Sequence, residues 1–133
     1  MPSKLRNTTR ARPRFGCGVD VVELARLKQA IARGGDAFLR RIFTTQERAY
    51  AQARRRTQLL HLAGRFAAKE AVIKAMSQLD PTRVPAMNQV EVRNDRFGRP
   101  HIALHDGRAA RVELHISLSH VDSVAVASAI AIQ

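Results

Sequence analysis

Cysteine, tryptophan and the other aromatic residues are scarce in this sequence. The single cysteine, Cys17, excludes an internal disulfide and a zinc site built from several cysteines, which suits a reducing compartment. Aromatic residues make up only 5% of the chain and do not alternate with basic ones, which argues against a surface that stacks single-stranded bases. No apolar run approaches the roughly 18 residues of a membrane span. We therefore expect a soluble, cytoplasmic protein with no membrane partner.

Acidic residues are also few, and this imbalance is the strongest compositional signal. The chain carries 23 Lys and Arg against 11 Asp and Glu, a formal net charge of +12. Such a surface favours an acidic partner: nucleic acid, an anionic membrane, a polyphosphorylated small molecule or an acidic protein. At 133 residues the chain fits one domain. We expect residues 1–14 to form a basic flexible tail and residues 15–133 to form the folded domain.

The hydrophobic pattern is strand-like at first, then helical, then strand-like again. Residues 15–23 (FGCGVDVVE) alternate as a strand does, with the glycines and Asp20 on one side, open to close approach by a ligand or another chain. Helices are expected at about 21–33, after Asp36, at about 45–55 behind a Thr44–Glu47 capping box, and at about 58–78. The strands 88–93, 99–105, 111–120 and 123–132 are expected to form an antiparallel meander.

The last expected strand is apolar on both faces. Valine and isoleucine occupy one face and alanine the other. A strand buried on both sides needs two covering layers, and a domain of this size has helices for only one of them. A second subunit is the natural candidate for the other layer, and we expect it to contact the alanine face at Ala127 and Ala129.

Two carboxylates lie in unusual positions. Glu70 falls in the same helical arc as Phe66, where burying an unpaired carboxylate costs several kcal/mol. A Glu70–Lys74 pair at i,i+4 is the structural alternative, but such a pair contributes only a few tenths of a kcal/mol. Asp20 lies near a strand end, and its D-x-x-E spacing with Glu23 also fits a helix N-cap.

Carboxylates held together in a low-dielectric pocket repel each other unless a proton or a cation lies between them. The sequence has no Cys or His pair at zinc spacing, and hard oxygen ligands favour Mg²⁺, which usually takes one or two carboxylates plus phosphates and water. A basic surface suits a pyrophosphate substrate. The residues alone therefore indicate Mg²⁺-dependent chemistry on a phosphate anhydride. Ser119 and His120, at the end of a strand, are a third candidate feature, which a solvated or capping role would also explain.

Five segments in this order resemble one known family: GVDVVEL at 18–24, IFTTQER at 42–48, AGRFAAKEAVIKAM at 63–76, GRPHI at 98–102 and HISLSHVDSVAVA at 115–127. They are similar to the holo-[acyl-carrier-protein] synthases, the small bacterial type of 4'-phosphopantetheinyl transferase. The resemblance covers about residues 15–132. G-[IVL]-D, F-x-x-K-E-A and S-x-[ST]-H make a specific combination, whereas an isolated G-x-D would mean little.

The resemblance implies an α+β, 4'-phosphopantetheinyl transferase-like fold, with a mostly antiparallel sheet packed against a long helix. It also implies a homotrimer with active sites at the subunit interfaces. The implied reaction transfers the 4'-phosphopantetheine group of coenzyme A to a serine of apo acyl carrier protein and releases adenosine 3',5'-bisphosphate. The carrier in this family is a small, strongly acidic protein.

Matched residue by residue, the resemblance also implies the roles within the site. The Mg²⁺ ligands fall on Asp20 and Glu70, and the catalytic candidates are Glu70 and Lys74, with Glu70 favoured as the base, directly or through a bound water. Coenzyme A binding falls on Arg65, Lys69, Lys74, Gly98, Arg99, Pro100, Ser119 and His120. We expect the carrier to dock on the basic side of the first helix, through Arg26, Lys28, Arg33 and Arg40.

Two features depart from the family pattern. Ile73 stands where a Ser is common, and residues 77–88 (SQLDPTRVPAMN) replace a Gly-rich turn. Such a turn can offer backbone N–H groups to phosphate. Its replacement therefore puts that contact with coenzyme A in question.

Two other functions stay open from the sequence alone. One is a transferase of the same superfamily that serves polyketide or peptide carrier domains, although those enzymes usually hold two such halves in one chain. The other is a non-catalytic nucleic-acid-binding domain that uses the +12 charge, a partner that we do not expect because aromatic residues are few.

Overall fold

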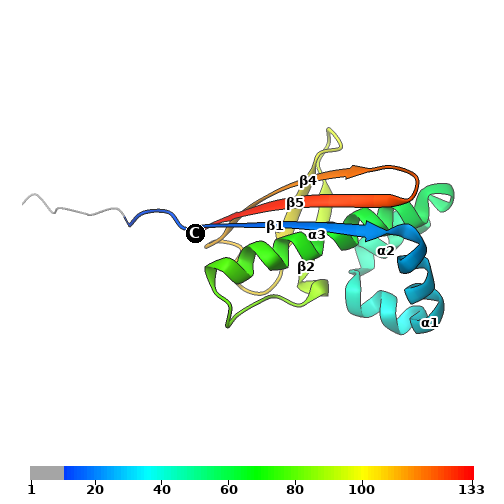
Figure 1. Ribbon diagram of the computed structural model, residues 1–133, viewed down its shortest axis with the longest axis horizontal. Coiled ribbons are helices and arrows are strands. Elements are labelled where there is room, and N and C mark those ends of the chain that lie inside the picture. Colours follow the sequence, from blue (N-terminus) through cyan, green and yellow to red (C-terminus); the bar gives the residue numbers. More distant parts are fainter. Residues whose placement is uncertain (1–10) are drawn as a thin grey trace, which may run out of the picture.

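The computed structural model of the protein describes residues 11–133. Its elements, in chain order, are β1 (Phe15–Glu23), α1 (Leu24–Ile42), α2 (Thr45–Gln52), η1 (Arg55–Thr57), α3 (Gln58–Leu79), η2 (Met87–Gln89), β2 (Val90–Asn94), β3 (Pro100–Leu104), β4 (Glu113–His120) and β5 (Val124–Ile132). The strands form two antiparallel sheets, one of order β1-β5-β4 and one of β2 and β3. In Figure 1 the long helix α3 runs along the three-stranded sheet, and α1 and α2 lie together at one end. The fold is α+β, as predicted.

Helix α3 packs against the sheet through very small residues. A Cβ atom built on Gly16 would lie 2.0 Å from the carbonyl oxygen of Ala75, and one built on Gly18 would lie 2.0 Å from that of Ala71. Strand β5 continues this surface with four buried alanines, Ala125, Ala127, Ala129 and Ala131. Gly16 and Gly18 therefore contact a helix of the same chain. The expectation that they admit a ligand or another chain is wrong.

Apart from Val22, the larger apolar residues of β1 and β5 point away from α3. Phe15, Val19, Val21 and Ile130 are 63%, 58%, 61% and 47% exposed, and all lie on the face opposite the helix. The expectation that Ala127 and Ala129 meet a second subunit is therefore wrong, because α3 already covers them. The free apolar face of the sheet is the valine and isoleucine face.

The first helix begins later than predicted and ends later too. Strand β1 continues to Glu23, and Asp20 pairs with Ala127 inside it, so Asp20 is not a helix N-cap. Glu23 takes the N-cap position without a side-chain hydrogen bond. The helix then runs to Ile42 across a kink at Gly35, whose φ of 57° a glycine adopts without strain. The capping box of Thr44 and Glu47 is present at α2, as predicted.

The four C-terminal strands do not form one meander. Strands β2 and β3 form their own hairpin, and β4 and β5 join β1 in the other sheet. Between β3 and β4 the chain makes a compact turn, in which the N–H groups of Arg111 and Val112 bond to the carbonyl oxygen of Arg108. This turn separates the two hairpins. Strand β1, from the start of the domain, takes the free edge of β5.

Hydrogen bonds hold Arg14, the last residue of the predicted tail, against the folded domain. The backbone of Arg14 exchanges two hydrogen bonds with Gln133, of 2.8 and 2.9 Å, and its guanidinium donates to the carbonyl oxygen of Leu79. Residues 1–10 of the predicted tail lie outside the described residues. Within residues 11–133, none of the helices is both long and apolar enough to cross a membrane.

Candidate active site

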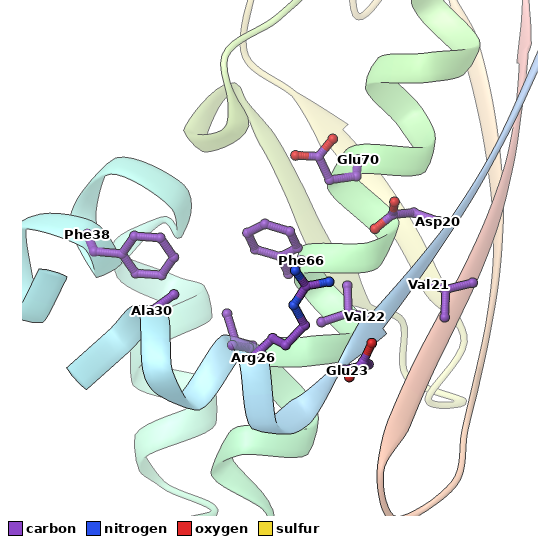
Figure 2. A pocket seen from close by; sticks show the side chains of 10 residues that line it. Asp20, Val21, Val22, Glu23, Arg26, Ala30, Phe38, Phe66 and Glu70 are labelled. Carbon is purple, nitrogen blue, oxygen red and sulfur yellow. The ribbon is translucent and has the colours of Figure 1, made fainter. Parts of the chain in front are cut away.

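A cleft of about 460 Å³ opens between β1, α1 and α3, and we call it the carboxylate cleft. Asp20 enters it from β1, Phe66 and Glu70 from α3, and Arg26 and Phe38 from α1. Figure 2 shows the Asp20 and Glu70 carboxylates projecting into the same space, with the Arg26 side chain reaching toward Phe66. The structure therefore brings together the two carboxylates that the sequence singled out, across fifty residues of chain.

The glycine contact explains why these two carboxylates meet. Gly18 touches Ala71, and Asp20 is the next residue of β1 on the same face. Glu70 immediately precedes Ala71 on the helix. Because no side chain separates β1 from α3 at this point, the carboxylates of neighbouring backbone segments share one small space.

The position of Glu70 in the cleft disfavours its charged form. Partial burial raises the pKa of Glu70, and the neighbouring Asp20 raises this pKa further, while Lys74 opposes both. The Lys74 ammonium lies 3.1 Å from Asp20 Oδ1 and donates to the carbonyl oxygen of Val19 at 2.9 Å. Lys74 thus pairs with Asp20, and not with Glu70 as the helical alternative supposed. One ammonium does not satisfy both carboxylates.

The donor set of the cleft fits Mg²⁺ better than zinc. In residues 11–133 no group of three or more His, Cys, Asp or Glu side chains is arranged to hold a metal. A cation held by Asp20 and Glu70 would therefore take its other ligands from water or from a substrate. Mg²⁺ commonly binds in this way, through one or two carboxylates, waters and substrate phosphates.

A second cleft, of about 280 Å³, lies on the other side of α3, and we call it the basic cleft. It collects five of the predicted coenzyme A residues: Arg65, Gly98, Pro100, Ser119 and His120. It shares no lining residue with the carboxylate cleft. The residues predicted to bind one coenzyme A molecule are therefore divided between two places in the chain.

Arg65 is the central cation of the basic cleft. It is 6% exposed, its Nη2 donates to Asn94 Oδ1 at 3.1 Å, and its guanidinium lies 4.1 Å from the centroid of the Tyr50 ring. Its Nε is buried and has no hydrogen-bond partner among the described residues. Burial and the charges of Arg65, Arg54 and His120 lower the pKa of His61. Such a cluster of donors and cations is suited to phosphate oxygens.

Two of the predicted coenzyme A residues lie elsewhere. Lys69 is fully buried, and its ammonium contacts Glu47 Oε1 at 2.5 Å and the carbonyl oxygens of Met87 and Val90 at 3.0 and 2.5 Å. Burial lowers the pKa of Lys69, and Glu47 opposes this. Lys69 therefore ties α3 to α2 and β2 and does not reach either cleft. Arg99 is exposed and pairs with Asp95 at 2.8 Å within the β2–β3 turn.

The predicted docking residues also separate. Arg26 lines the carboxylate cleft. Lys28 and Arg40 line hollows on the opposite flank of α1, and Arg33 is exposed without lining any of these spaces. Only Arg26 is thus placed to meet a partner that reaches Glu70.

Sequence reasoning missed several residues of the two clefts. Phe38 and Phe66 wall the carboxylate cleft, and Tyr50, His61 and Asn94 line the basic one. The spacing of His61 and Arg65, four residues apart on one helix, is a signal that the sequence contained. Tyr50 is the chain's one tyrosine, but its place beside Arg65 depends on how α2 packs on α3.

Comparison with known proteins identifies the family of this chain. The model of the 4'-phosphopantetheinyl transferase superfamily matches residues 16–129. The holo-[acyl-carrier-protein] synthase of Solidesulfovibrio magneticus is 42% identical over 118 residues, which cover 84% of this chain and 93% of that protein. The synthase of Koribacter versatilis is 40% identical over 123 residues, covering 87% and 96%. In structure, the ACPS–CoA complex of Chronobacterium ammoniagenes superposes with a TM-score of 0.76 at 35% identity, covering 89% of this chain and 96% of that one.

Proposed function

The chain belongs to the 4'-phosphopantetheinyl transferase superfamily, and we propose that it acts as a holo-[acyl-carrier-protein] synthase in the cytoplasm. It transfers the 4'-phosphopantetheine group of coenzyme A to a serine of apo acyl carrier protein and releases adenosine 3',5'-bisphosphate. The observation that carries the proposal is the pair of carboxylates in one cleft, Asp20 and Glu70, beside the basic residues Arg26 and Lys74.

The transfer forms one bond and breaks one. The serine oxygen of the carrier bonds to the phosphorus on the pantetheine side of the coenzyme A pyrophosphate, and the bond from that phosphorus to the bridging oxygen breaks. Adenosine 3',5'-bisphosphate leaves with that electron pair. Glu70 accepts the serine proton, directly or through a water, because its carboxylate projects into the cleft where the serine would meet the pyrophosphate. Lys74 lies close enough to Asp20 to meet a phosphate oxygen in the same space.

Asp20 and Glu70 would hold Mg²⁺, with the remaining ligands supplied by water and by the pyrophosphate. When bound, the ion supplies positive charge that offsets the charge on the phosphate anhydride. The raised pKa of Glu70 supports this assignment, because a cation beside the two carboxylates would relieve their repulsion.

We further propose that three copies assemble through the exposed face of the three-stranded sheet. In the sheet order β1-β5-β4 the two edges are β1 and β4. The carboxylate cleft adjoins the β1 edge and the basic cleft adjoins the β4 edge, through residues such as Ser119. A closed ring of three sheets brings the β1 edge of each copy beside the β4 edge of the next. One coenzyme A molecule would then contact the carboxylate cleft of one copy and the basic cleft of its neighbour.

Mass spectrometry of apo acyl carrier protein, incubated with this protein, coenzyme A and Mg²⁺, tests the proposal. The carrier should gain the mass of one 4'-phosphopantetheine group. Asp20→Asn and Glu70→Gln should each lower the transfer rate at least about a hundredfold, because each removes a charged metal ligand. Glu23→Gln is the matched control, since Glu23 is exposed at the edge of the same cleft. Near-normal transfer by either site variant would refute the two-carboxylate site.

A further inference from the structure

Two hollows, of about 370 and 380 Å³, border the flank of α1 that faces away from the carboxylate cleft. They share Leu39, Gln58 and Leu62 as walls, so they adjoin each other between α1, α2, η1 and the start of α3. We call the two adjoining hollows together the helical groove. It shares no lining residue with the carboxylate cleft or the basic cleft.

The floor of the helical groove is apolar and comes from two helices. Ile31 and Leu39 lie on α1, and Leu59 and Leu62 lie on α3. Three of them, Ile31, Leu39 and Leu59, are only partly buried within the chain. An aliphatic floor of this kind offers a small inorganic anion no hydrogen bond, but it suits the apolar side chains of a larger partner.

The rim of the helical groove is strongly basic. Lys28, Arg55 and Arg56 line one hollow, and Arg40 and Arg48 line the other, against the single acid Asp36. None of these five cations makes a salt bridge with any residue of the described chain, and residues 1–10 contain no acidic residue that could supply one.

One rim residue has a buried donor that lacks an acceptor. Arg48 donates from Nη2 to Thr45 Oγ1 at 3.3 Å, but its Nε is buried without a partner among the described residues. A buried donor without an acceptor costs free energy. The Arg48 guanidinium thus has donor capacity that the described chain does not use.

We propose that the helical groove binds an amphipathic acidic helix of a partner protein. Apolar side chains three and four residues apart would enter the two hollows in line, and carboxylates on the flanks of that helix would meet the cations of the rim. Two adjoining apolar hollows with cations around both favour a helix over a compact anion. Arg26 and Lys28, both exposed, lie on opposite flanks of α1. The groove can therefore be filled while the carboxylate cleft is also occupied.

A synthetic helix tests this assignment directly. The probe is a fluorescent 16-residue peptide with Leu at helical i, i+3, i+4 and i+7 positions and Glu on both flanks, titrated with the full chain by anisotropy. Lys28→Glu should weaken binding at least about tenfold, and binding to the wild type should weaken as salt is raised. Arg26→Glu is the matched control on the other flank, and it should change the affinity less than about twofold.

Three outcomes would overturn the assignment. A peptide of the same composition with its Leu residues scrambled around the helix could bind equally well, which would show attraction by charge alone. Arg26→Glu could weaken binding as much as Lys28→Glu does. Phosphatidylglycerol vesicles could bind more tightly than the peptide with the same dependence on Lys28, which would make an anionic lipid surface the occupant. Ile31→Ser removes part of the apolar floor and should also weaken peptide binding. If this variant does not fold, the comparison of Lys28→Glu with Arg26→Glu still tests the proposal.

Discussion

Glu70 lies in surroundings that disfavour its charged form. Partial burial and the Asp20 carboxylate both raise its pKa, and Lys74 only partly offsets them. A carboxyl group whose pKa is raised in the folded state stabilises the fold when it is protonated, at a pH below the pKa of the unfolded chain. This contribution is lost as the pH rises through the folded pKa. At neutral pH the charged Glu70 therefore lowers the stability of the domain.

Glu70→Gln should accordingly raise the midpoint of thermal unfolding at pH 7 in the absence of metal. The gain should shrink on acidification and disappear below about pH 4, where the wild-type side chain is protonated in both states. Added Mg²⁺ should stabilise the wild type and leave Glu70→Gln unchanged. Unfolding scans over pH, with and without Mg²⁺, measure all three effects. A variant less stable than the wild type at pH 7 would contradict this account of the site.

Arg26 is an exposed cation of α1 that lines the carboxylate cleft, and its role can be separated from that of the general positive charge. If an acidic carrier docks there, Arg26→Glu should raise the KM for the carrier several-fold and leave the KM for coenzyme A nearly unchanged. The difference between variant and wild type should narrow at high salt, because the Debye length falls from about 10 Å at 0.1 M to about 3 Å at 1 M. Steady-state kinetics at two salt concentrations measure this. Equal effects on both substrates would exclude Arg26 as a docking residue.

At the scale of elements, the contact between β1 and α3 positions the site. Gly18→Ala would place a Cβ atom 2.0 Å from the Ala71 carbonyl oxygen, so strand and helix would have to separate. We expect this variant to lose at least about 1–3 kcal/mol of unfolding free energy. Gly64→Ala is the matched control, since its Cβ would meet only Leu118 at 3.9 Å and alanine favours a helix. Denaturant unfolding compares the two, and equal stability would mean that the close approach is not required.

Sequence pattern located the elements better than it oriented them. The Thr44–Glu47 capping box is a local signal, and it was confirmed. The alternation in β1 was also a sound signal for a strand, but alternation does not say which face packs inward. Large side chains such as Val19 and Val21 suggested one face, while the structure buries the glycine face. The choice depends on α3, whose backbone can approach only where side chains are absent, and this contact joins segments far apart in the chain.

At the scale of the whole molecule, we expect three copies to assemble through the exposed face of the three-stranded sheet. Val19 and Ile130 are exposed in the single chain, so Val19→Glu or Ile130→Glu should leave the domain folded while preventing association by placing a charge in an apolar contact. Ala127→Glu should instead unfold the domain, because Ala127 is fully buried under α3. Sedimentation should show a trimer for the wild type and monomers for the two surface variants. A fully active wild-type monomer would refute both the assembly and the shared site.

The meeting of the two carboxylates could be predicted from the sequence, but the arrangement of the residues around them could not. Asp20 and Glu70 could be paired from their residue types and from the resemblance. The burial of Lys69 could not, because it depends on Glu47 from α2 and on the backbone of β2. The placement of Arg26 and Lys28 in different hollows could not be predicted either. It depends on where α1 packs, and no spacing within one segment specifies that position.

The pairing of β1 with β5 has a consequence for the order in which the protein is made. Strand β1 is the first strand of the domain, and within the described chain its sole strand neighbour is β5, the last, with Phe15 opposite Ile132. A ribosome therefore has to release the chain through β5 before β1 can join its sheet. Until then Asp20 lacks its partner Ala127, and the face that carries it is held by α3 alone. The two carboxylates of the cleft are thus held together only after β5 has been made, so a nascent chain stalled before β5 would hold Glu70 on a formed helix without a fixed Asp20 beside it.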